Sequence, residues 1–79
     1  MGHWNYRILA EVVEDHTEYF VAEVYYNDKG DIRAWSDRDL NVLSGWDKLE
    51  DLQLTAKQVH EALERPVLRV MGDKLVPWE

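Results

Sequence analysis

The chain of 79 residues contains no cysteine, two prolines and four glycines, and it has no long apolar run. Without cysteine, disulfide bonds and thiolate metal sites are excluded, so the stability has to come from an apolar core. Neither a membrane span nor a secretory signal can be read in the sequence. We therefore expect one soluble, cytoplasmic domain over residues 1–79, built on the 46% of residues that are hydrophobic.

Basic residues are also scarce, because nine Lys and Arg stand against sixteen Asp and Glu, which gives a net charge of -7. This charge repels nucleic-acid phosphates and anionic membranes, so we expect no direct nucleic-acid partner and no membrane partner. The acidic surface has two interpretations. It keeps a small domain soluble, or it attracts a basic protein.

Two stretches, residues 4–13 and 19–26, alternate between apolar and other side chains with the period of half-buried strands. The even positions of both stretches are expected to face the core. A turn at residues 15–17 would pair them with Ile8 beside Val24.

Residues 27–31 predict a hairpin loop in which Gly30 takes a positive φ angle. This loop leads into a third strand over residues 32–35 and completes an antiparallel meander. Its register would place Arg7, Tyr25 and Arg33 in one row on the outer face of the sheet.

A single helix is predicted after an irregular connection over residues 36–46, in which Leu40, Val42 and Leu43 are expected to reach the core edge. Asp47 and Glu50 have the spacing of a capping box at the helix start. The apolar stripe that would face the sheet consists of Leu49, Leu52, Ala56, Val59 and Leu63.

Pro66 ends the helix, residues 67–71 predict a further strand, and Gly72 and Asp73 would turn the chain into a short tail. A right-handed crossover would place this last strand parallel to the first. The predicted fold is α+β: a three-stranded antiparallel meander, one helix packed on one face, then a C-terminal strand (βββαβ).

One helix can cover one face of such a sheet, and the other face would still carry apolar side chains. We interpret that outer face as a protein interface, because aromatic residues and Arg are enriched where proteins meet. The alternative is a solvated face on which arginines stack on a tyrosine. The candidate interface residues are Arg7, Leu9, Val21, Tyr25, Arg33 and Trp35.

Catalytic and metal-binding patterns were sought without result. The three histidines, His3, His16 and His60, lack metal-binding spacing. Asp28 and Asp31 flank a glycine as in a calcium loop, but the other ligands of that motif are missing. No nucleophile elbow or phosphate loop occurs either. The sequence therefore predicts a protein that is not an enzyme, with no catalytic residue, metal site or cofactor.

Several segments in this order resemble the HicB-like antitoxin superfamily and, more closely, a group of short bacterial proteins. The segments are Trp4-Asn5-Tyr6-Arg7-Ile8, Tyr19-Phe20-Val21-Ala22, Glu23-Val24-Tyr25-Tyr26, Trp35, Gly45-Trp46-Asp47-Lys48-Leu49-Glu50-Asp51-Leu52 and Ala62-Leu63-Glu64-Arg65-Pro66-Val67-Leu68. The resemblance implies a sheet with one helix and a following strand, and, for true antitoxins, neutralisation of a small basic RNA-cleaving toxin. A Pro-Asp-Leu-Pro-Gly-like segment of that superfamily is absent here.

The function expected from residues and resemblance together is a protein-interaction module that forms a homodimer, binds a small basic protein, or does both. An alternative is an acidic inhibitor of phage or plasmid origin that imitates nucleic acid. That alternative requires carboxylates arrayed along one ridge.

Overall fold

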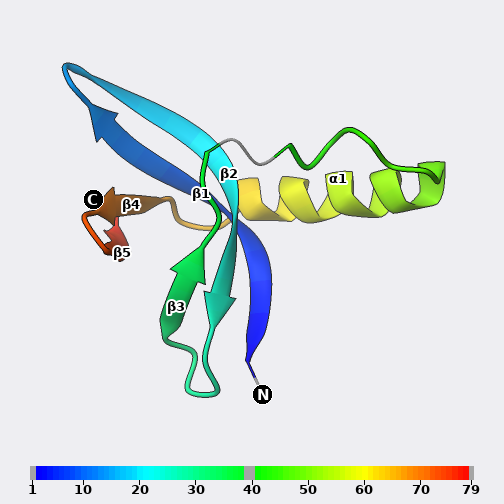
Figure 1. Cartoon of the computed structure of the whole chain (residues 1–79). Coiled ribbons are helices and arrows are strands. Elements are labelled where there is room, and N and C mark those ends of the chain that lie inside the picture. Colours follow the sequence, from blue (N-terminus) through cyan, green and yellow to red (C-terminus); the bar gives the residue numbers. More distant parts are fainter. Residues whose placement is uncertain (1, 39–40, 79) are drawn as a thin grey trace.

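The computed structural model describes residues 2–38 and 41–78, and it begins with one long hairpin (Figure 1). Strand β1 (His3–Val13) and strand β2 (His16–Tyr26) are antiparallel along their whole length. Only Glu14 and Asp15 connect them, and Glu14 has a φ angle of 57°. A two-stranded ribbon of this length twists strongly, so β1 and β2 cross each other in the view of Figure 1.

The register of this hairpin differs from the expected one. Ile8 lies opposite Val21 rather than Val24, because the turn is at residues 14–15 instead of 15–17. An odd shift in register moves a strand's side chains to the opposite face. The odd positions of β1 therefore share a face with the even positions of β2, which we name the inner face. The even positions of β1 and the odd positions of β2 form the helix face.

Three shorter strands extend the hairpin: β3 (Ile32–Trp35), β4 (Leu68–Met71) and β5 (Lys74–Pro77). The strand order is β3-β2-β1-β4-β5, in which β4 is parallel to β1 and the other neighbours are antiparallel. The protein is thus α+β, with a curled mixed sheet of five strands and one helix, α1 (Leu49–Leu63). The expected parallel strand is confirmed, but the predicted tail is a fifth strand.

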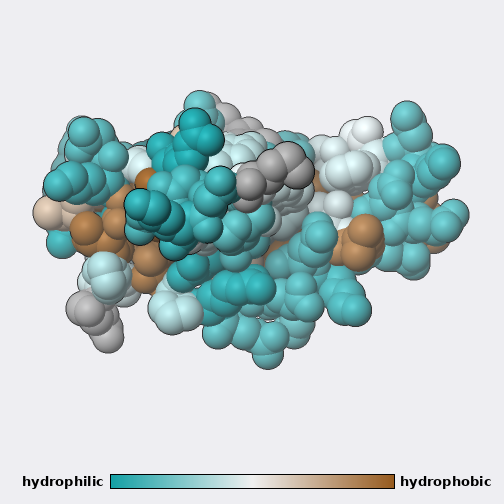
Figure 2. Space-filling model, turned by 90° about the horizontal axis from the view of Figure 1, so that it is seen from below, coloured by the Kyte–Doolittle hydropathy of each residue, from teal (hydrophilic) through white to brown (hydrophobic). Residues whose placement is uncertain are grey.

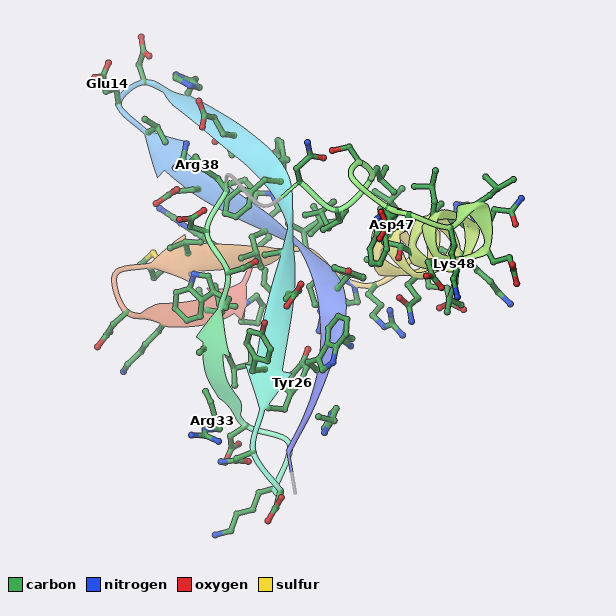
Figure 3. The ribbon with its side chains drawn as sticks, turned by 45° about the vertical axis from the view of Figure 1, so that its right-hand side comes forward. Glu14, Tyr26, Arg33, Arg38, Asp47 and Lys48 are labelled. Carbon is green, nitrogen blue, oxygen red and sulfur yellow. The ribbon has the colours of Figure 1, made fainter. Side chains whose placement is uncertain are left out.

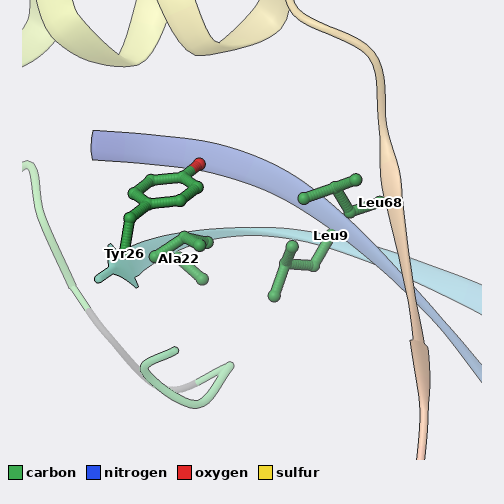
Figure 4. Close-up of a cluster of buried hydrophobic side chains, with 5 residues drawn as sticks. Leu9, Ala22, Tyr26 and Leu68 are labelled. Atoms are coloured by element: carbon green, nitrogen blue, oxygen red, sulfur yellow. The ribbon is translucent and has the colours of Figure 1, made fainter. Parts of the chain in front are cut away.

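The core lies on the inner face (Figure 4). This face joins the even positions of β2, which were expected to face the core, to the odd positions of β1, which were expected to face outward. Its buried residues are Leu9, Ala22, Val24, Tyr26 and Leu68, against which Phe20, Ile32, Trp35, Val70 and Leu75 pack. The sheet curls until β3 and β5 border the same hollow. Because the chain closes over its own inner face, the expectation that Leu9 and Trp35 lie on a bare sheet face is wrong.

Helix α1 packs against β1 through one end and extends away from the sheet at the other (Figure 1). Thr55 and Ala62 are its buried residues, whereas three members of the predicted stripe, Leu49, Ala56 and Leu63, are exposed. The helix is therefore rotated about its axis relative to the prediction. Both buried side chains are small.

The segment before α1 also differs from its prediction. Lys48 is the N-cap residue and makes no side-chain cap bond, so the capping box predicted for Asp47 is wrong (Figure 3). Leu43 is exposed and Val42 is half-buried, so Leu43 does not reach the core edge. Leu40, expected there too, lies outside the described residues.

Arg38 fastens the chain after β3 to the inner face. Glu11 and Glu18 lie directly opposite each other across β1 and β2, where two negative charges repel. The Arg38 guanidinium forms ion pairs with both carboxylates, and it also lies 5.7 Å from the ring centroid of Phe20. One cation thus offsets a like-charge pair and covers part of the hairpin (Figure 3).

Replacing Leu9 by Ala should lower the free energy of unfolding by about 2 to 5 kcal/mol, because Leu9 is 0% exposed and the change leaves a cavity. The measurement is urea unfolding followed by tryptophan fluorescence. Leu54→Ala is the matched control, since Leu54 is 57% exposed and should lose far less. Equal losses in the two variants would contradict the burial of Leu9.

Glu14→Gly should stabilise the protein by about 1 kcal/mol, because a φ angle of 57° places a residue with a Cβ in the left-handed region. The gain is partly offset by the greater freedom of Gly in the unfolded chain. Thermal unfolding measures it. Asp15→Gly, at the neighbouring turn position, is the control and should not stabilise. A destabilised Glu14→Gly variant would contradict the turn geometry.

Candidate interaction surfaces

The six predicted interface residues do not form one surface. Leu9 is buried, Trp35 packs on the core, and Val21 lies half-buried on the helix face. Tyr25 lies opposite Ala34 rather than Arg33, because a bulge shifts the register between Tyr25 and Tyr26. The predicted row of Arg7, Tyr25 and Arg33 is therefore wrong, although Tyr25 and Arg33 are both exposed.

Arg7 is tied into the structure instead of forming a contact surface. Its guanidinium donates to the Tyr26 hydroxyl at 3.2 Å and to the Pro66 carbonyl at 2.8 Å. The Tyr26 hydroxyl in turn donates to the Asn5 side-chain oxygen at 2.8 Å. The charge-assisted bond from Arg7 to the Pro66 carbonyl fixes the point where the chain leaves α1 for β4.

One edge of β1 is open along its first half. Within the described part of the chain, β4 pairs with β1 only at Leu9 and Ala10, so His3–Ile8 have a neighbouring strand on one side alone. On the other side of the hairpin, the backbone N–H of Glu23 donates to the Ser36 hydroxyl, and its C=O accepts from the Ser36 N–H. Both backbone groups of Glu23 therefore point away from β1. Because Glu23 lies opposite Tyr6, these two residues form a pair of the antiparallel ladder that is not joined by backbone hydrogen bonds. The backbone N–H and C=O of Tyr6 consequently point outward from the hairpin.

A groove of about 350 Å³ lies between this open edge and α1. Strand β1 contributes Trp4, Asn5 and Tyr6 to its lining, and the C-terminal part of the helix and the residues after it contribute Gln58, Glu61 and Arg65. The rings of Trp4 and Tyr6 meet edge to face at 5.1 Å between centroids. Trp4 is 47% exposed, so the groove has an accessible aromatic wall.

The carboxylate of Glu23 determines the electrostatics on this part of the helix face. Burial, and then the charge of Glu23, raise the pKa of the Tyr6 phenol. The hydrogen bond that Tyr25 donates to Glu23 is the main cause that raises the pKa of Tyr25. Both phenols are thus held in their neutral form beside a negative charge.

A second candidate surface is a row of apolar residues along α1. Leu49, Ala56 and Leu63 are spaced seven residues apart, so they lie on one side of the helix, and all three are exposed. We name them the helix row. Figure 2 shows apolar surface on the part of the molecule formed by α1, separate from the apolar surface at the end that carries β4 and β5.

Sequence reasoning missed both the groove and the exposure of the helix row. A signal for the groove was present, because a predicted strand over 67–71 is about half as long as its predicted neighbour over 4–13. Half of the first strand had to remain without a partner on that edge. The phase of the helix had no such signal, since Leu52 and Val59 fit either orientation.

Comparison with known proteins gave no further information: no family model, curated protein or solved structure matches this chain significantly. Among the described residues, no three His, Asp or Glu side chains gather as a metal site would require. Helix α1, the one helix in residues 2–38 and 41–78, lacks the length and apolar character needed to cross a membrane.

Tyrosinate absorbance should show phenols that ionise above the ordinary value of 10.0. Glu23→Gln should lower the pKa of Tyr25 more than that of Tyr6, because burial is the larger cause for Tyr6. The raised pKa also determines how stability depends on pH. A phenol whose pKa is higher in the folded than in the unfolded state stabilises the fold below pH 10, and this stabilisation is lost as the pH rises through the pKa of the folded state. Tyr25→Phe and Tyr6→Phe identify the two transitions. An unchanged titration in Glu23→Gln would contradict the assignment.

Proposed function

We propose that this domain is a non-enzymatic protein-interaction module of HicB-like type, which forms a homodimer through the helix row. The observation that carries the proposal is the exposure of Leu49 and Leu63, which are 67% and 63% accessible to solvent. Large apolar side chains exposed in a row on one helix are typical of a surface that another chain covers. The HicB-like assignment itself is supported by the sequence resemblance alone.

The spacing of the row fits a second copy of the same helix. Leu49, Ala56 and Leu63 recur every seven residues, and the half-buried Leu52 and Val59 border them, so the apolar positions alternate in steps of three and four, the pattern of a helix-pairing seam. In an antiparallel pair about a two-fold axis, Leu49 of each copy would lie opposite Leu63 of the other, and Ala56 would lie at the axis. A small residue at that position allows two helices to approach closely.

The helix dipoles favour the same arrangement, because antiparallel pairing would align the two dipoles in opposite directions. The side-chain charges do not add to this preference. Glu50 and Asp51 lie in the first turn of α1, and at its other end Glu61 and Glu64 offset His60 and Arg65.

The alternative, an acidic imitation of nucleic acid, has less support. Its carboxylates should follow one ridge, but those of the described residues are scattered over β1, β2 and their turn, the segments on both sides of β3, both ends of α1 and the turn between β4 and β5. The net charge of -7 instead supports a basic protein as an additional partner.

Sedimentation equilibrium tests the homodimer. We expect the wild-type protein to dimerise and Ala56→Glu to raise the dimer dissociation constant by about a hundredfold, because two carboxylates would meet at the axis. Leu54→Glu is the matched control, since Leu54 is exposed on another side of α1 and should leave the dimer intact. A monomeric wild type, or equal effects of the two substitutions, would contradict the helix row as the dimer surface.

A further inference from the structure

We infer that the groove between β1 and α1 binds an extended segment of a partner protein that carries Lys or Arg, and that this segment joins the sheet beside His3–Ile8. The inference rests on the proposed function only in that the domain acts through protein contacts. It requires no second copy of the chain.

The backbone of β1 supplies the first argument. The edge of β1 is paired to β4 at Leu9 and Ala10 and is open before them. Since Tyr6 directs its N–H and C=O outward, Trp4 does the same two positions earlier, whereas the outward C=O of Ile8 lies where the pairing with β4 begins. An unpaired row of this kind is a template for an added strand, which gains main-chain hydrogen bonds.

The fold itself leaves the edge open. Parallel pairing with β4 would continue toward the start of β1 if the residues before Leu68 were extended. Instead, Arg7 holds the Pro66 carbonyl at 2.8 Å, and the chain leaves the sheet there to join α1. The helix stands beside the edge without filling the space, and the groove of about 350 Å³ remains.

The lining of the groove indicates the chemistry of the added segment. Trp4 offers an exposed ring, and a Lys or Arg side chain gains energy by lying over such a face. Glu61 lies across the groove, and Glu23 lies opposite Tyr6 on the neighbouring strand. Arg65 is the one cation among the lining residues. Glu61 and Arg65 offset each other within the lining, so a basic segment is favoured by the exposed Trp4 ring, the Glu23 carboxylate beside the groove and the net charge of -7.

The test is an amide NMR titration of the Ala56→Glu variant, which keeps the groove and removes the proposed dimer. The probe is a short peptide of alternating Lys and Val, compared with one of alternating Glu and Val. We expect the Lys peptide to shift the amide signals of residues 4–8 and to slow hydrogen exchange at Tyr6. No shift there, or equal shifts with the Glu peptide, would overturn the inference.

A Lys and Val peptide with every backbone nitrogen methylated keeps the side chains but lacks N–H donors, so its binding should be lost. Trp4→Ala should weaken binding of the parent peptide about two- to fivefold, the scale of an exposed cation–π contact. Trp46→Ala, with a similarly exposed ring, is the matched control. Binding of the methylated peptide, or equal effects of the two Trp variants, would overturn strand addition in this groove.

Because these measurements use a variant without the proposed dimer, they separate the two proposals. A wild type that is monomeric by sedimentation would overturn the dimer and leave the groove intact. A peptide that shifts signals on the helix row instead of residues 4–8 would overturn the groove and leave the dimer intact.

Discussion

The register of the β1–β2 hairpin is the constraint on which the rest of the structure depends. A connection of only Glu14 and Asp15 sets Leu9 opposite Phe20, and this pairing decides which side chains share a face. The inner face then receives the residues that β3, β4 and β5 can enclose, whereas Tyr6 and its neighbours face α1. A shift of one residue would move the side chains of one strand to the other face and leave both layers without complementary partners.

Periodicity predicted the kinds of element well, because strands and helices differ clearly in their spacing of apolar residues. The turn was less predictable for two reasons. The residue with a left-handed backbone is Glu14 and not a glycine, and the polar residues that usually mark a turn continue through Thr17. The phase of α1 was ambiguous for another reason. Thr55 and Ala62 are small, and small residues mark the buried side of a helix less clearly than Leu49 or Leu63 marks an apolar stripe.

The predicted site was misplaced because a flat sheet was assumed. A flat sheet with one helix has a bare face, but a twisted ribbon with short outer strands can curl until those strands cover it. The curl buries Leu9 and leaves Trp35 half-buried against the core. Two sets of groups then remain without a partner in the described structure: the apolar side chains of the helix row and the backbone N–H and C=O groups on the open edge of β1. Neither follows from the alternation of residues within a strand.

The two surfaces use different sides of the same helix. Thr55 and Ala62 lie on its buried side, Gln58 and Glu61 line the groove, and the helix row lies away from the groove. Pairing of two helix rows would therefore leave both grooves open. A two-fold dimer would present two grooves that each bind a basic segment. If one partner carries two such segments, binding of the first segment would place the second at a high effective concentration near the other groove. Dimerisation could thus strengthen partner binding without adding a contact to either groove.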